Sequence, residues 1–126
     1  MQIFKTRWFA RFAGNERIAD KSLREAIERA EQGLIDADLG GGLIKQRVPR
    51  PGHGRSGGYR VIVAYRMRNR AVFLYGFAKS AKANISAKEL ATARNIASIW
   101  LTAEGERISR GIREDEIQEV IDGEED

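Results

Sequence analysis

The stretch YRVIVAYRMRNRAVFLYGF, residues 59–77, decides the fold. It holds two runs rich in β-branched and aromatic residues, Tyr59–Tyr65 and Ala71–Phe77, with a hairpin turn offered by Asn69-Arg70 between them. An earlier run, LIKQRV at 43–48, alternates in the way that a half-buried strand does. Since the connections are short, the three runs predict an antiparallel meander.

Aromatic residues at helical spacing precede this predicted sheet. We expect a short strand at Met1–Phe4. It runs into an amphipathic helix, which is predicted by the spacing of Phe4, Trp8, Phe9 and Phe12. We expect the aromatic stripe of this helix to pack in the core rather than to stack on bases.

Two further helices are predicted from capping boxes. Ser22-Leu23-Arg24-Glu25 favours a helix over about 23–32, and Ser86-Ala87-Lys88-Glu89 favours one that continues through Leu101. The order of these elements predicts an α+β fold, in which a small twisted antiparallel sheet of three to four strands carries two N-terminal helices and one C-terminal helix.

Charge divides the chain into two parts. Residues 1–101 carry 19 Lys and Arg against 8 Asp and Glu, a net charge of +11, whereas residues 102–126 carry 3 against 10, a net charge of −7. We therefore expect a domain at 1–101 and an acidic C-terminal appendage at 102–126, partly helical or loose. From Leu39 to Lys88 there are 11 basic residues and no acidic one. Such a segment attracts polyanions, and nucleic acid is the expected class of partner.

Composition excludes several kinds of site. The chain has no cysteine and a single histidine, so it can form neither a disulfide nor a multi-histidine metal site. Residues 39–88 offer no carboxylate for catalytic metal ions, and Gly54–Gly58 lacks the spacing of a Walker motif. We expect no metal and no cofactor. No apolar run approaches the roughly 20 residues of a membrane span, and the N-terminus is unlike a signal peptide, so a cytoplasmic location is expected.

The basic side chains suit the handling of phosphate. Lys45 and Arg47 lie two residues apart in a strand, so they share one face of the sheet. Arginine offers a planar fork to phosphate oxygens, and lysine offers a point charge. The residues expected to contact RNA are Lys45, Arg47, Arg50, Arg55, Arg66 and Lys82.

RNA also carries its own nucleophile, the 2′-hydroxyl. Cleavage can therefore proceed without a metal if proton transfers are assisted and the developing charge is stabilised. His53 and Tyr59 are candidates for assisting proton transfer.

Four motifs are similar in order and spacing to those of a known family. They are FKTRWF at 4–9, DLGGGLIKQRV at 38–48, GRSGGYR at 54–60 and YGFAK at 75–79. Over about residues 1–101 the chain resembles the RelE/HigB-like toxins of bacterial type II toxin–antitoxin modules.

This resemblance implies a ribosome-dependent endoribonuclease that cuts mRNA. It also implies a co-encoded antitoxin as partner, expected to be of the helix-turn-helix type. Arg60 matches the strand arginine associated with catalysis, and Lys79 matches the basic residue after the last strand of the sheet. Lys45 and Arg47 fall where basic strand residues contact RNA, whereas Arg55 stands where this subgroup commonly has lysine.

Two other functions remain open from the sequence. A ParE-like toxin of the same fold that acts on DNA gyrase would also carry a basic surface. A non-catalytic RNA-binding module would do so as well.

Overall fold

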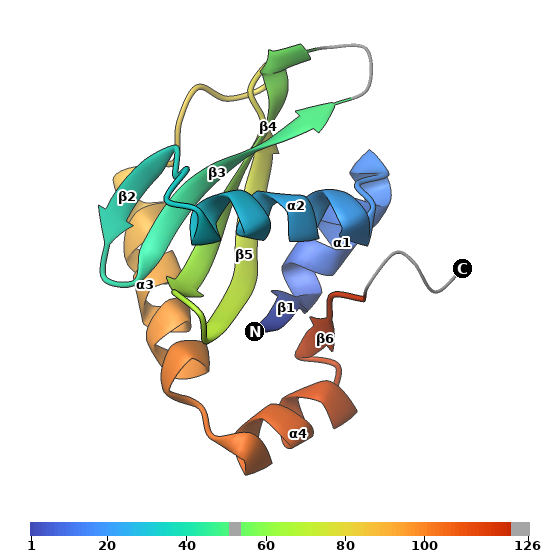
Figure 1. The fold of residues 1–126 in the computed structure, drawn as a ribbon, viewed down its shortest axis with the longest axis vertical. Coiled ribbons are helices and arrows are strands. Elements are labelled where there is room, and N and C mark those ends of the chain that lie inside the picture. Colours follow the sequence, from blue (N-terminus) through green and yellow to red (C-terminus); the bar gives the residue numbers. More distant parts are fainter. Residues whose placement is uncertain (51–53, 122–126) are drawn as a thin grey trace.

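The run at 59–77 forms the centre of a sheet, as β4 (Gly54–Arg66) and β5 (Arg70–Ala78). The computed structural model describes residues 1–50 and 54–121, and only the backbone of 54–56. These residues form six strands and four helices (Figure 1). The other strands are β1 (Gln2–Thr6), β2 (Ala37–Gly40), β3 (Leu43–Arg50) and β6 (Ile117–Glu119). The helices are α1 (Arg7–Glu16), α2 (Asp20–Glu31), α3 (Ala87–Thr102) and α4 (Gly105–Arg113).

The sheet is mixed, with the strand order β2-β3-β4-β5-β1-β6. The meander of β3, β4 and β5 is antiparallel, but β1 pairs in parallel with β5, and β6 then pairs with β1. The predicted architecture of three to four antiparallel strands with a single C-terminal helix is therefore wrong. The α+β fold has a six-stranded mixed sheet and four helices in its described part. The missed pairings join segments about 70 and 115 residues apart, for which local periodicity carries no signal.

The helices cover the two faces of the sheet unequally. Figure 1 shows α2 crossing in front of β3, β4 and β5, with α1 beside it and α3 behind the sheet. The α1/α2 face buries Phe9, Leu23, Ile27 and Phe73 in one cluster. The α3 face buries a second cluster that includes Ile62, Val72, Ala97 and Trp100.

The two N-terminal helices begin at different residues from those expected. Thr6 caps α1 by accepting a hydrogen bond from the Phe9 N–H, so Phe4 belongs to β1 and is buried there. Helix α2 begins at Asp20 after Ala19, and the capping box predicted at Ser22 is not formed, because Ser22 lies inside the helix. The capping box of Ser86 and Glu89 at the start of α3 is confirmed.

Residues beyond 101 pack against the body of the protein. Ile108, Ile117 and Val120 are buried, and the side chain of Arg7 donates to the backbone carbonyls of Glu114 and Asp115, each at 3.0 Å. The division of the chain at residue 101 stays a prediction. Of the described residues, no helix is both long enough and apolar enough to span a bilayer.

Two motif glycines allow close packing of the sheet. A Cβ on Gly58 would lie 2.4 Å from the carbonyl oxygen of Val48, and one on Gly76 would lie 2.5 Å from the ring of Phe12. The absence of a side chain at Gly58 thus allows the backbone of β3 to approach closely, and its absence at Gly76 allows Phe12 of α1 to pack against β5. Both glycines position the neighbouring residues Tyr59 and Phe77.

A β-bulge in β5 changes which side chains face α3. Tyr75 pairs with Ile62, and Phe73 pairs with Val63, so Leu74 is the extra residue. As a result, the consecutive residues Leu74 and Tyr75 both pack with the α3-face cluster, whereas strict alternation would send them to opposite faces.

Candidate nucleic-acid interface

Arg60 is a buried arginine in the interior of the sheet. In the register of the meander it lies between Arg47 of β3 and Phe77 of β5. Strand alternation places it on the same face as Ile62, which packs with the α3-face cluster. The exposed fraction of Arg60 is only 5%, which is unusual for a charged side chain.

Arg60 forms no ion pair within the described part of the chain. Its Nη1 donates to the carbonyl of Tyr59 at 3.4 Å, and within the described part of the chain no carboxylate lies at ion-pairing distance. A buried cation is costly unless an anion accompanies it. Arg47, directly opposite on β3, adds repulsion between like charges. An anion bound here would therefore be favourable.

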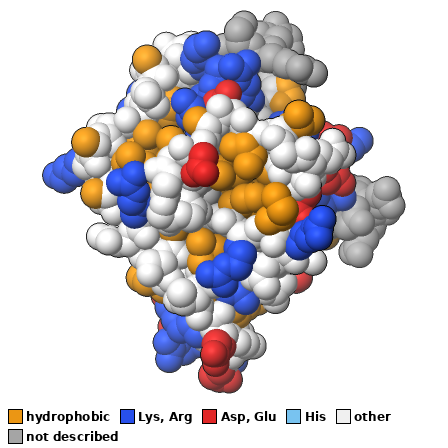
Figure 2. All heavy atoms as spheres, turned by 60° about the vertical axis from the view of Figure 1, so that its left-hand side comes forward, with side chains coloured by type: hydrophobic (Ala, Val, Ile, Leu, Met, Phe, Trp, Pro, Cys, Tyr) orange, Lys and Arg blue, Asp and Glu red, His pale blue; other side chains and the backbone are white. Residues whose placement is uncertain are grey.

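Lys45 and Arg47 extend this charge across β3. Asp36 approaches both, with Oδ1 at 3.0 Å from Nε of Arg47 and Oδ2 at 3.8 Å from Nζ of Lys45. We name Lys45, Arg47 and Arg60 the basic cluster. One carboxylate faces three cations, so the cluster keeps a net positive charge. Figure 2 shows a group of Lys and Arg side chains at the top of the view, others spread over the same face, and a hydrophobic area in its middle.

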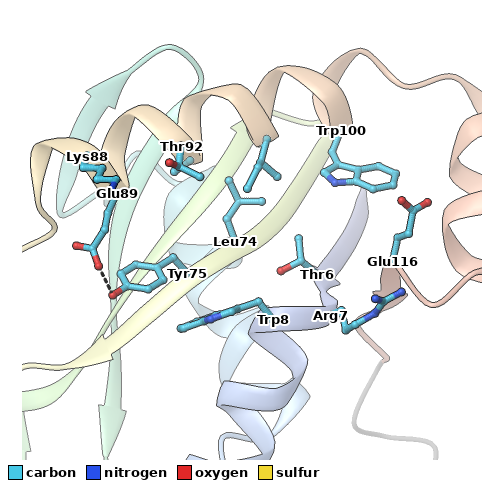
Figure 3. Close-up of a pocket in the computed structure, with 12 residues that line it drawn as sticks. Thr6, Arg7, Trp8, Leu74, Tyr75, Lys88, Glu89, Thr92, Trp100 and Glu116 are labelled. Carbon is cyan, nitrogen blue, oxygen red and sulfur yellow. Dashed lines mark hydrogen bonds between the residues drawn. The ribbon is translucent and has the colours of Figure 1, made fainter.

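A second polar group lies beside the basic cluster, where β5 meets the start of α3. The hydroxyl of Tyr75 donates to Oε2 of Glu89 at 2.7 Å (Figure 3), and Lys82 forms an ion pair with the same carboxylate. Lys82 Nζ also lies 5.4 Å from the centre of the Tyr75 ring and 5.8 Å from that of Phe77.

The contacts among Tyr75, Lys82 and Glu89 shift the pKa values of these side chains. The hydrogen bond from Lys82, with those from the backbone of Ser86 and from Tyr75, lowers the pKa of Glu89 to about 2. The bond to Glu89 raises the pKa of Lys82, and burial raises that of Tyr75. At neutral pH Glu89 is therefore charged, and Tyr75 and Lys82 hold their protons.

The structure brings together only part of the predicted site. Lys45, Arg47 and Arg60 form adjacent positions on one face, and Lys82 lies near Phe77 at the same end. Lys79 is exposed directly after β5, and its N–H donates to the carbonyl of Gly58 at 3.1 Å.

Three of the predicted residues are separated from Arg60. Tyr59 points to the α1/α2 face, where its hydroxyl donates to Glu16 at 3.0 Å, and Arg50 packs over the Tyr59 ring at 5.6 Å. Burial and the bond to Glu16 raise the pKa of Tyr59. Arg66 lies six residues along β4 from Arg60, or about 20 Å at the usual rise of a strand. His53 and the side chain of Arg55 lie outside the described residues.

Sequence reasoning missed Asp36 and Glu89 as neighbours of the cationic residues. Both lie just outside the acid-free segment 39–88 in the sequence. In the fold, Asp36 contacts Lys45 and Glu89 contacts Lys82, both of which belong to that segment. The capping box was the only signal for Glu89, and it indicated a role in the helix alone. Among the described residues, no three His, Asp or Glu side chains gather closely enough to hold a metal ion.

Comparison with protein families gives one match. Residues 1–120 match the family described as the RelE toxin of the RelE/RelB toxin–antitoxin system. No curated protein matches the chain significantly.

Proposed function

The chain belongs to the RelE toxin family, and from this premise we propose that it is an endoribonuclease that cuts mRNA on the ribosome and so blocks translation. As a RelE toxin it has an antitoxin as its partner. The finer proposal concerns the reaction: cleavage proceeds through the 2′-hydroxyl of the RNA, with no metal ion required.

The observation that carries this proposal is the state of Arg60. It is buried, it has no carboxylate partner within the described chain, and it lies beside Arg47 and Lys45. A phosphodiester supplies the missing negative charge, and two anionic oxygens match the fork of a guanidinium. Charge that grows on those oxygens during the reaction would be stabilised by donors already in position.

The proposed step breaks one bond and forms one. The 2′-oxygen attacks the adjacent phosphorus, the bond from phosphorus to the 5′-oxygen breaks, and the products are a 2′,3′-cyclic phosphate and a 5′-hydroxyl. A base must take the proton of the 2′-hydroxyl, and an acid must protonate the leaving oxygen.

Arg60, Lys45 and Lys79 would hold the phosphate oxygens during this step. Tyr75 and Lys82 keep their protons at neutral pH and so are suited to donate rather than to accept. His53 stays a candidate for the base. Among the described residues, Tyr75 and Lys82 hold their protons and so are unsuited to act as the base. We therefore expect the isolated protein to cut naked RNA poorly, and we expect the ribosome to supply the missing alignment.

Mapping the ends of cleaved mRNA tests this proposal. Expression of the chain should produce new 5′-hydroxyl ends and 2′,3′-cyclic phosphates, or 3′-phosphates after ring opening. A 2′-deoxy nucleotide before the cut should stop cleavage on programmed ribosomes. A 5′-phosphate product, or normal cleavage of the deoxy substrate, would show the mechanism to be wrong.

The antitoxin is proposed to be a small helix-turn-helix protein encoded beside this chain. With a net charge of +11, residues 1–101 would attract acidic segments of such a partner, and the complex should weaken as salt rises. Co-expression with the neighbouring gene, followed by gel filtration at low and high salt, measures this. Failure of the two proteins to co-elute, with no rescue of growth, would count against the helix-turn-helix partner.

A further inference from the structure

A hollow of about 590 Å³ lies between the start of α1, strand β5 and helix α3. Its interior is mostly apolar, with Leu74, Ala93, Ile96 and Trp100 among the lining residues. Figure 3 shows Trp8 on one side of this space, Trp100 on the opposite side, and Tyr75 with Glu89 at one end. We name this space the aromatic hollow.

Trp8 offers a flat aromatic surface to the hollow. Its exposed fraction is 47%, although the aromatic stripe to which it belongs was expected to be core. Phe12 stacks on it at 5.6 Å between ring centres with an angle of 16°, and Tyr75 lies against it at 4.8 Å. These contacts hold the indole ring in place while one part stays accessible. Every nucleobase has a π face that can stack on such a ring.

Glu89 adds a hydrogen-bond acceptor at the end of the hollow. A carboxylate has about four acceptor positions, and here Lys82, Tyr75 and the N–H of Ser86 occupy three. The fourth position can accept from an amino group. Cytosine, adenine and guanine carry an exocyclic amino group, whereas uracil does not.

The hollow and the basic cluster share no lining residue, but they are neighbours along β5, where the ring of Phe77, paired with Arg60, lies 6.1 Å from the ring of Tyr75 at the end of the hollow. Tyr75 lies in the same row of the sheet as Lys45, two strands away, which is about 10 Å at the usual spacing. Arg60 and Phe77 occupy the next row on that face, about 7 Å along the strands. Arg7 and Lys88, both exposed, line the hollow together with Glu116, whose charge is paired with Arg107. A strand of RNA whose phosphate contacts Arg60 can therefore place a neighbouring base at Trp8.

We propose that the aromatic hollow binds one unpaired base of the RNA, stacked on Trp8, and that Glu89 favours a base with an amino group over uracil. This inference rests on the proposed function and deepens it, since it assigns a base-recognition site to the same surface. The rival occupant is an apolar segment of a protein partner. The cations that line the hollow and the acceptor at its end favour the base.

Binding of short oligonucleotides to the full chain tests this inference. The probes are pentamers of cytidine and of uridine with 2′-O-methyl groups, which cannot react through the 2′-oxygen. We expect the cytidine pentamer to bind about tenfold more tightly than the uridine pentamer and to quench tryptophan emission. Trp8→Leu keeps an apolar side chain without the π surface, and it should weaken cytidine binding about tenfold.

Three further variants separate stacking and base choice from structural effects. Trp8→Phe keeps an aromatic ring and should retain most of the affinity. Glu89→Gln keeps the helix cap but offers both a donor and an acceptor, so the preference for cytidine should fall to about twofold or less. Leu34→Ala removes another exposed apolar side chain, one outside the hollow, and should change nothing.

Wild-type affinity of Trp8→Leu for cytidine, or equal binding of the two pentamers by the wild type, would overturn the inference. So would loss of antitoxin binding by Trp8→Leu with RNA affinity intact, since the hollow would then dock protein. If ribosome-dependent cleavage persists, each of these results rejects the base-binding site but leaves the proposed function standing. Absence of both RNA binding and cleavage would instead reject the proposed function, and this inference with it.

Discussion

The two faces of the sheet differ in how completely their buried polar side chains are hydrogen-bonded. On the α1/α2 face, Gln46 is 1% exposed, and its amide donates to the carbonyls of Ala26 and Leu34 and accepts from the Asp36 N–H. On the α3 face, Arg60 is nearly as buried and donates one long hydrogen bond. Gln46 is satisfied within the fold, whereas Arg60 makes one long hydrogen bond and no ion pair within the described residues. A polar group with complete partners stabilises the structure, and a charged group without them indicates a site.

The reason for the contrast lies in the helices. Two helices, α1 and α2, pack against one face, and α2 brings backbone carbonyls directly to Gln46. On the other face α3 packs over the strands, with Ile108 of α4 added to the same cluster, and Arg60 is not part of that cluster. Lys45, Arg47 and Arg60 occupy adjacent positions of β3 and β4 on that face.

Replacing Arg60 should have the largest effect on activity. Arg60→Met keeps a long side chain but removes the charge and the donors, so cleavage should fall by about 10²–10³-fold. The melting temperature should stay within a few degrees or rise, because an unpaired buried cation is removed. Growth after induced expression and the yield of mapped mRNA ends measure the first effect, and thermal unfolding measures the second. Full growth arrest by a stable Arg60→Met protein would contradict the assignment.

Replacing Gln46 should give the reverse pattern. Gln46→Leu removes the three hydrogen bonds that the buried amide makes with Ala26, Leu34 and Asp36, so the free energy of unfolding should fall by roughly 2–4 kcal/mol. Cleavage per folded molecule should be unchanged at a temperature at which the variant stays folded. Denaturant unfolding gives the stability. A selective loss of cleavage with normal stability would mean that the two faces are not divided as we propose.

Glu89 should make the stability of the α3 face depend on pH. Because its pKa is lowered to about 2 from an ordinary value of 4.5, its contribution is fully present above about pH 4.5 and is lost as the pH falls through about 2. The wild-type melting temperature should therefore decline over this window, and Glu89→Gln should decline less steeply. Thermal unfolding from pH 2 to pH 6 provides the comparison. Parallel curves for the two proteins would show that the Lys82–Glu89 contact adds nothing to stability.

Tyr59 should give the smallest effect. Tyr59→Phe removes the hydrogen bond to Glu16 and should cost about 1 kcal/mol of unfolding free energy. Because its hydroxyl lies on the α1/α2 face, we expect cleavage to be unchanged on ribosomes. If cleavage instead fell by tenfold or more at unchanged stability, the role in proton transfer that the sequence suggested for Tyr59 would regain support.

Several elements could be predicted from the sequence because their signals are local. The alternation at 43–48, the β-rich runs within 59–77 and the capping box at Ser86 each depend on residues a few positions apart. The capping box expected at Ser22 is not formed because α2 already begins at Asp20, which places Ser22 inside the helix. The places of β1 and β6 depended on partners far along the chain, and these could not be read from periodicity.

By itself, the sequence determined the sign of the charge, the central meander and the resemblance to a toxin family that the family match then bore out. Only the tertiary structure decided which of those charges act together. It turned Tyr59 and Arg60, neighbours in the chain, to opposite faces of the sheet, and it brought Asp36 and Glu89 against cations that lie 7 to 11 residues away in the sequence. The physical reason is that strand alternation, a β-bulge and the unequal cover of helices set the burial and the partners of each side chain, and those depend on contacts between residues far apart in the chain.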